Sequence, residues 1–221
     1  MYIQLDSQVI NYEHTGEGSP LILLHGNGED HHIFDELIAA LGDRYDIYAL
    51  DSRGQGESAT PAEYHYEDMA DDVANFIRYY NIEKPSVVGF SDGGIIALIC
   101  AVKNPDLIGE LMICGANTNP DGLTWATKRE IKRDYKRTKS ELIGMMLREP
   151  NITDEQLRSI HIPTIVIAGE KDIVKPKHTQ HIVDVIPNST LRIMEGENHG
   201  SYVIHSDKLE DLIRDYIGGQ R

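Results

Sequence analysis

The sequence predicts an α/β fold in which helices cover both faces of a mostly parallel sheet of about eight strands. The first observation behind this prediction is the alternation of strand-like and helix-like segments along the chain. The second is that the strand-like runs are apolar throughout, as in strands buried on both faces. The third is size, since 221 residues with 40% hydrophobic side chains suffice for one domain with a sizeable core.

The predicted strands are short and bounded by polar residues. Two runs of alternating polarity within residues 2–12 favour a β-hairpin at the sheet edge. The later strands are continuous apolar runs. They lie, in order, at residues 20–24, 47–50, 86–88, 108–114, 162–168 and 191–194.

The helices between these strands follow from apolar spacing. Phe34, Leu37, Ile38 and Leu41 recur at helical intervals after the strand at 20–24. The other helices are predicted at residues 66–80, 95–100, 178–186 and about 202–216.

One segment has no strand signal. Residues 118–161 contain a helix-like stretch over 123–148 and a shorter helical piece after 150–153. We expect this segment to form a short helical lid inserted into a core made of residues 1–117 and 162–221.

Between the strand at 86–88 and the helix that follows lies Gly89-Phe90-Ser91-Asp92-Gly93-Gly94. Its Gly-x-Ser-x-Gly spacing is the nucleophile-elbow pattern. At a sharp strand-to-helix turn the flanking positions have no room for side chains, and glycine has none. The turn would hold the Ser91 hydroxyl above the carboxyl end of the sheet, beside a helix N-terminus that favours negative charge.

A serine hydroxyl needs a base, and the base needs an orienting acid. Asp172 and His199 each lie just past a predicted strand, in loops expected at the same edge of the sheet. The chain order Ser91, Asp172, His199 is that of one known type of catalytic triad. We predict that His199 takes the serine proton and that Asp172 orients the imidazole.

With these motifs the chain resembles the α/β-hydrolase superfamily over essentially its whole length. His25-Gly26-Asn27-Gly28 resembles the family's H-G-x-G loop, which implies an oxyanion hole formed by the backbone N–H groups of Asn27 and Asp92. Residues 51–58 resemble its D-x-R-G-x-G-x-S loop, which we interpret, Arg53 included, as structural. Because the apex residue is Ser91, the aspartate-dependent dehalogenases and epoxide hydrolases of the superfamily do not fit. The resemblance implies no organic cofactor and no metal, and we expect the tandem His31-His32 to face solvent in different directions.

Asp92 and Trp125 are the candidate substrate-binding residues. Some relatives with a Ser-Asp-Gly-Gly elbow, the valacyclovirase-like hydrolases, act on amino-acid esters, so Asp92 either binds a substrate ammonium or hydrogen-bonds its own surroundings. Trp125 begins the insertion and either lines the pocket or packs the lid. Seven of the 21 basic residues lie within 128–139 and form either a solvated helix face or a rim that attracts anionic substrates.

Composition and charge exclude some classes of binding partner. The net charge of −15 argues against general nucleic-acid binding. No apolar run approaches the length of a membrane span and no signal peptide is evident, so we expect no membrane association. Cys100 and Cys114 lie in apolar stretches and are interpreted as buried free thiols of a cytoplasmic protein.

The resemblance implies a serine hydrolase that cleaves small carboxylic esters through an acyl-enzyme. Two alternatives remain open. The same triad also serves C–C bond hydrolysis and menaquinone-pathway-like eliminations, and the fold also occurs in non-catalytic ligand receptors.

Overall fold

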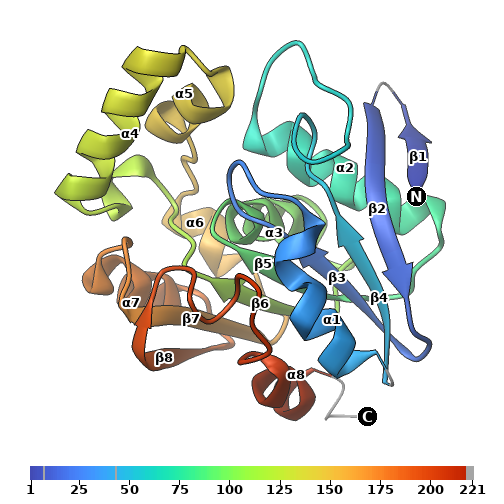
Figure 1. Cartoon of the computed structure of the whole chain (residues 1–221). Helices are drawn as coiled ribbons and strands as arrows, with labels where there is room; N and C mark the ends of the chain where they lie inside the picture. Colours follow the sequence, from blue (N-terminus) through green and yellow to red (C-terminus); the bar gives the residue numbers. More distant parts are fainter. Residues whose placement is uncertain (7, 43, 218–221) are drawn as a thin grey trace.

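In the computed structural model, which describes residues 1–6, 8–42 and 44–217, eight strands form one sheet in the order β1-β2-β4-β3-β5-β6-β7-β8 (Figure 1). β2 runs antiparallel to β1 and β4, and the remaining pairs are parallel. The predicted fold class and the edge hairpin are therefore confirmed. The strands are β1 (Tyr2–Leu5), β2 (Gln8–Thr15), β3 (Ser19–Leu24), β4 (Tyr45–Leu50), β5 (Ser86–Phe90), β6 (Glu110–Cys114), β7 (Thr164–Lys171) and β8 (Ser189–Asn198).

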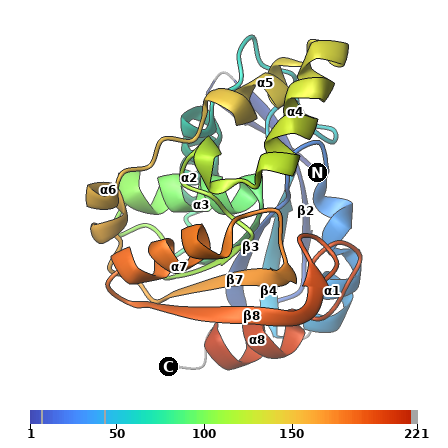
Figure 2. The same ribbon diagram turned by 90° about the vertical axis from the view of Figure 1, so that its left-hand side faces the viewer.

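Helices cover both faces of this sheet, as Figures 1 and 2 show. On one face, α1 (Asp35–Leu41) and α8 (Glu210–Tyr216) bury their apolar side chains against the strands. On the other face lie α2 (Tyr66–Tyr79), α3 (Asp92–Lys103) and α7 (Pro176–Val185). No helix of the described residues is long and apolar enough to cross a membrane.

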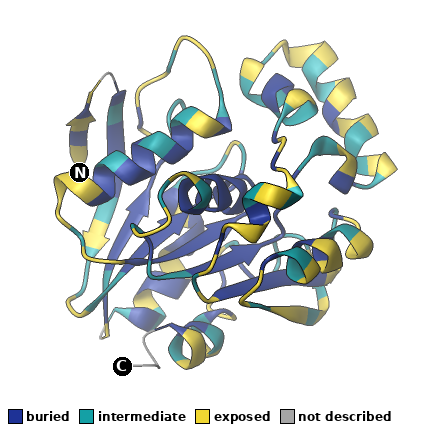
Figure 3. Cartoon of the chain, turned by 180° about the vertical axis from the view of Figure 1, so that it is seen from behind, coloured by how far each residue is buried: buried dark blue, intermediate teal, exposed yellow. Residues whose placement is uncertain are grey.

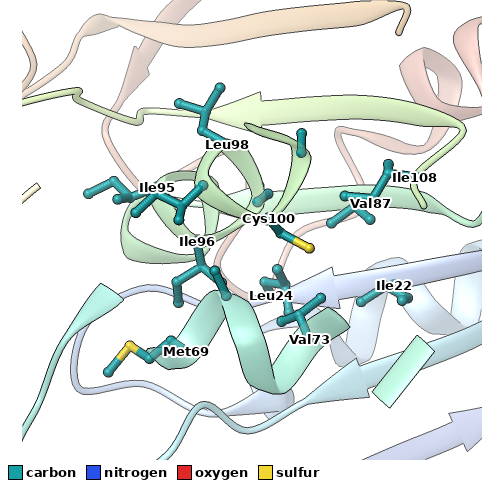
Figure 4. Close-up of a cluster of buried hydrophobic side chains, with 14 of the residues drawn as sticks. Ile22, Leu24, Met69, Val73, Val87, Ile95, Ile96, Leu98, Cys100 and Ile108 are labelled. Carbon is teal, nitrogen blue, oxygen red and sulfur yellow. The ribbon is translucent and has the colours of Figure 1, made fainter. Parts of the chain in front are cut away.

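α3 is the most buried helix of the core. Its side chains are apolar on every side and pack between the sheet and α2. Figure 4 shows this packing, with Ile96 of α3 facing Leu24 of β3 and Met69 and Val73 of α2. Because such close-packed side chains resist displacement, the first residue of α3 is held firmly against the ends of β3 and β5.

The segment between β6 and β7 is helical. It contains the 3₁₀ turn η2 (Pro120–Gly122) and the helices α4 (Trp125–Thr138), α5 (Glu141–Arg148) and α6 (Asp154–Arg158). The single helix predicted over 123–148 is wrong, because Lys139 adopts a left-handed conformation with φ of 56° and the Ser140 side chain caps α5. α4 and α5 are mostly exposed or half-buried (Figure 3). A small apolar cluster around Ile131 lies between them and the core.

The last predicted helix is also shorter than expected. α8 begins at Glu210, and residues 201–205 form turns. Tyr202 and Val203 are nevertheless fully buried against the same face as α8. The apolar spacing of these residues is typical of a helix, but side chains in a turn can be buried in the same way.

The loop between β4 and α2 has the structural role expected for it. Arg53 makes a bidentate ion pair with Asp72 of α2, with N···O distances of 2.7 and 2.8 Å. Only 13% of the Arg53 side chain and 9% of the Asp72 side chain are exposed. The pair therefore ties the loop to α2.

We expect Asp72→Ala to lower the free energy of unfolding by about 3 kcal/mol, because it leaves a largely buried guanidinium without its main partner. Asp134→Ala is the matched control, since Asp134 pairs with the exposed Arg137 and such surface pairs contribute about 0.5 kcal/mol. Urea unfolding of both variants and the wild type gives the comparison. Equal losses in the two variants would contradict a buried tie at Arg53.

Candidate active site

Ser91 lies at the turn between β5 and α3, in a conformation outside the strand and helix regions (φ 52°, ψ −114°). The flanking glycines are required by space. A Cβ on Gly89 would overlap the Gly93 carbonyl, and a Cβ on Gly93 would overlap the carbonyl of Leu24 in β3. A backbone strained in this way costs on the order of 1–3 kcal/mol and persists only where the surroundings enforce it. The turn therefore holds the Ser91 hydroxyl where the helix begins.

The three predicted triad residues meet. His199 Nε2 lies 3.0 Å from Ser91 Oγ, and His199 Nδ1 lies 2.7 Å from Asp172 Oδ1. Asp172 follows the end of β7 and His199 follows the end of β8, as the sequence predicts. His199 and Asp172 lie 108 and 81 positions after Ser91 in the sequence, and the three residues form one hydrogen-bonded line.

Asp172 is ionised and directs the imidazole. Burial by itself raises its pKa, but the hydrogen bond and charge of His199 and the N–H groups of Val174 and Gly169 outweigh burial and lower the pKa. A carboxylate only accepts hydrogen bonds, so Nδ1 carries the donated proton and Nε2 presents a lone pair to the Ser91 hydroxyl.

Gly115, just past β6, makes room for the imidazole. Its φ is +65°, and a Cβ there would lie 2.7 Å from His199 Cε1. The absence of a side chain at this position lets the histidine ring lie close to the backbone.

Two backbone N–H groups, those of Asn27 and Asp92, donate no hydrogen bond within the described residues. The loop that carries Asn27 is held by the buried His25, whose Nδ1–H donates to the Gly26 carbonyl at 2.7 Å. The same ring accepts the Ser52 N–H at Nε2, 2.9 Å away. Free, fixed N–H groups are what an oxyanion requires.

The Asp92 carboxylate is buried, with 2% of the residue exposed. It accepts hydrogen bonds from Asn27 Nδ2, at 2.9 Å, and from the Tyr66 hydroxyl. Burial raises its pKa to about 6, although both hydrogen bonds and the charge of His199 oppose the shift. Asp92 thus links both chain segments that carry the free N–H groups.

Sequence reasoning missed Tyr66 and Glu29. Glu29 accepts the Gly26 N–H at 2.9 Å, burial raises its pKa, and the charge of His199 acts in the opposite direction. Its place two residues after Asn27 offered a local signal for this contact. No sequence signal brings Tyr66 of α2 to Asp92, since the contact depends on how α2 packs on α3.

Trp125 is not brought to these residues. It is 72% exposed, and the Arg129 guanidinium stacks over its ring at 5.4 Å. With basic residues of α4 it lines a shallow hollow in which no triad residue takes part. Both expected roles, pocket lining and lid packing, are therefore unsupported by its position.

His31 and His32 differ from expectation as well. The two rings lie side by side, with centroids 4.1 Å apart, rather than pointing different ways. His31 is buried because Nδ1 donates to Asp51, whereas His32 faces solvent. The pairing with Asp51 needs a residue from the next strand end, which the local sequence does not reveal.

Comparison with known proteins identifies the fold family of this chain. The sequence profile of the α/β-hydrolase fold matches residues 19–140. Serine hydrolase BPHL from Homo sapiens is 28% identical over 94% of this chain and 82% of its own length. A pimeloyl-acyl-carrier-protein methyl ester esterase from Neisseria meningitidis is 24% identical over 89% of this chain and 93% of its own. The structure of a meta-cleavage product hydrolase from Pseudomonas fluorescens shares the fold, with a TM-score of 0.84 and 20% identity over 100% of this chain and 98% of that one.

The burial of Asp92 predicts a pH-dependent cost in stability. Its pKa is about 6 in the folded protein against an ordinary value of 3.8, so between these pH values the folded state binds more protons than the unfolded chain. The contribution of Asp92 to stability therefore falls as the pH rises through this window. Asp92→Asn keeps an acceptor for Asn27 and Tyr66 and does not ionise. Near pH 7.5 we expect it to be about 3 kcal/mol more stable than the wild type.

Urea unfolding at about pH 4 and pH 7.5 measures this difference. The advantage of Asp92→Asn should shrink to a small fraction at the lower pH, because the folded-state carboxyl is protonated there and pH 4 lies close to the ordinary pKa of 3.8 in the unfolded chain. A difference that does not change with pH would contradict a buried, ionising Asp92.

Proposed function

Since this chain belongs to the α/β-hydrolase fold family and is a hydrolase of that family, we propose that it cleaves small carboxylic esters through an acyl-enzyme on Ser91. The observation that carries the proposal is the line from Asp172 through His199 to Ser91, beside the two free N–H groups. Similarity to a protein called a serine hydrolase and to one called a methyl ester esterase supports it.

In the first half of the proposed reaction, Ser91 Oγ attacks the ester carbonyl carbon while its proton passes to His199 Nε2. The carbonyl oxygen becomes an oxyanion that accepts hydrogen bonds from the N–H groups of Asn27 and Asp92. When the C–O bond to the alcohol breaks, His199 returns the proton to the leaving oxygen. The alcohol departs and the acyl group stays on Ser91.

In the second half, a water molecule replaces the alcohol. His199 removes one of its protons as its oxygen attacks the acyl carbon, and the same two N–H groups stabilise the second oxyanion. The bond to Ser91 then breaks and Oγ recovers the proton from His199. The products are a carboxylic acid and the free enzyme, and Asp172 stays ionised throughout.

We further propose that residues 118–161 act as a small lid over the core of residues 1–117 and 162–221. The segment leaves the sheet at the end of β6, where the Cys114 carbonyl accepts the Ser91 N–H at 2.7 Å. It is tied back to the core by the bridge between Leu123 and Val174 and by Thr118, whose N–H donates to His178. Cys100 and Cys114 are both buried and free, which fits the proposed cytoplasmic location.

For Asp92 we propose a positioning role, because its carboxylate is occupied by Asn27 and Tyr66. By binding the Asn27 side chain it steadies the neighbouring backbone donor. A second candidate is recognition of a substrate ammonium. It is favoured by one observation: within the described residues, Asp92 forms no ion pair with lysine or arginine.

A fluorophosphonate probe tests the nucleophile. We expect wild-type protein to be labelled and Ser91→Ala to be unlabelled, since the probe needs an activated hydroxyl to displace its fluoride. In Ser91→Ala, the kcat/KM for hydrolysis of p-nitrophenyl acetate should be lower than in the wild type by at least about 10³-fold. Ser159→Ala is the control, because the Ser159 hydroxyl donates to the Gln156 carbonyl and takes no part in the triad. Its labelling and its kcat/KM should equal those of the wild type.

Wild-type protein that takes no label would argue for a ligand receptor on this fold. Ser91-dependent labelling without turnover of esters of any chain length would favour C–C hydrolysis or elimination, which the same triad serves.

A matched pair of esters, one with a free α-amino group and one N-acetylated, separates the two roles of Asp92. With a positioning role, kcat/KM for the two esters should agree within about threefold, because no full charge pair is formed or lost. A large preference for the amino ester that Asp92→Asn removes would show ammonium recognition instead.

A further inference from the structure

A second group of chemically able side chains lies on the far side of the loop that carries Asn27. Asp30, His31 and His32 stand at the start of the 3₁₀ helix η1 (His31–Phe34). One carboxylate oxygen and one ring nitrogen from each histidine all lie within 4.8 Å of one another. Glu13 of β2 lies outside this group of three, with its Oε2 at 3.7 Å from His31 Nε2.

Both histidines are held in the same tautomer. His31 Nδ1 lies 2.8 Å from Asp51 Oδ1, and His32 Nδ1 lies 3.2 Å from Asp35 Oδ2. Each carboxylate can only accept, so each Nδ1 carries a donated hydrogen, and in the neutral ring Nε2 is the atom with the lone pair. A carboxylate behind a histidine in this way is the arrangement that orients metal-binding imidazoles.

The carboxylate behind His31 is firmly built. Asp51 is fully buried and also accepts from Asn11 Nδ2 and from the Glu57 N–H, both at 2.9 Å. Burial by itself raises its pKa, but these hydrogen bonds, with those from His31, outweigh burial and lower it. His31 is thereby fixed with Nε2 toward Glu13 and only a tenth of its side chain exposed.

The charges around the two rings are unbalanced. Glu13, Asp30, Asp35 and Asp51 surround the pair, and within the described residues none of the four forms an ion pair with lysine or arginine. In the neutral ring a lone pair on His31 Nε2 faces the Glu13 carboxylate, and either a proton on Nε2 or a metal cation between the two groups removes this repulsion. A cation at this point would satisfy both groups.

We propose that Asp30, His31 and His32 bind one divalent transition-metal ion of the zinc class, with the half-exposed Glu13 side chain turning in as the fourth ligand. Two imidazole nitrogens and two carboxylate oxygens suit Zn²⁺, whereas Mg²⁺ prefers oxygen ligands and keeps most of its water. The 3.7 Å between Glu13 and His31 is close to the spacing of two ligands on one tetrahedral ion. The ion would join β2 to the segment that follows the Asn27 loop and so brace that loop from outside, apart from the triad.

Titration of the tag-free, chelator-treated protein with Zn²⁺ and, separately, Mg²⁺ tests the site by calorimetry. We expect one Zn²⁺ per chain with a dissociation constant in the micromolar range or below, and Mg²⁺ weaker by at least about 100-fold. Saturating Zn²⁺ should raise the Tm by at least about 3 °C, because it binds only the folded state.

His32→Gln and Glu13→Gln are the informative variants, since the His32 side chain is mostly exposed and that of Glu13 nearly half exposed. Each should weaken Zn²⁺ binding at least about tenfold and reduce the Tm rise. His181→Gln is the matched control, because His181 is an exposed histidine paired with Asp154 far from the cluster. It should leave both readouts unchanged.

Three results would overturn the proposal. One is the absence of saturable Zn²⁺ binding at about 100 µM, a concentration that would fill any site with a micromolar dissociation constant. Another is binding that neither His32→Gln nor Glu13→Gln weakens. The third is binding that His181→Gln weakens as much as they do, which would mark general histidine capture.

Discussion

The structure depends on the close approach of three backbone segments at the Ser91 turn. Gly93 rests against the Leu24 carbonyl of β3, and Gly89 rests against Gly93, so a methyl group at either glycine would overlap a carbonyl. The buried packing of α3 supplies the force that maintains this contact. The same contact aims the serine hydroxyl, frees the Asp92 N–H and sets the distance to the loop of Asn27.

Three buried carboxylates around this turn show how partners decide charge. Asp172 and Asp51 each accept several hydrogen bonds, including one from a histidine, and their pKa values are lowered. Asp92 accepts only from the neutral Asn27 and Tyr66, and burial prevails. The first two carboxylates hold imidazoles in a fixed tautomer. The third joins two loops at a cost in stability.

The helical segment 118–161 is less tightly packed than the sheet and the helices that cover it. Its apolar contacts are few, two of its three α-helices are short, and most of its charged residues face solvent. Elements with little burial open at low free energy, which is consistent with the lid role proposed for this segment. The sheet and α3 carry the geometry, and the insertion adds little to it.

What the sequence by itself determined was local: the alternation of strands and helices, the glycine spacing around Ser91, and the loops that hold Asp172 and His199. These follow from periodicity and from sterics between neighbours in the chain. Tertiary structure alone decided that Tyr66 meets Asp92, that His31 turns inward to Asp51 and that Trp125 stays exposed. Each of these depends on which distant segments share a surface. The partner of a side chain depends on which distant residues the packing places next to it, and the local sequence pattern does not specify those residues.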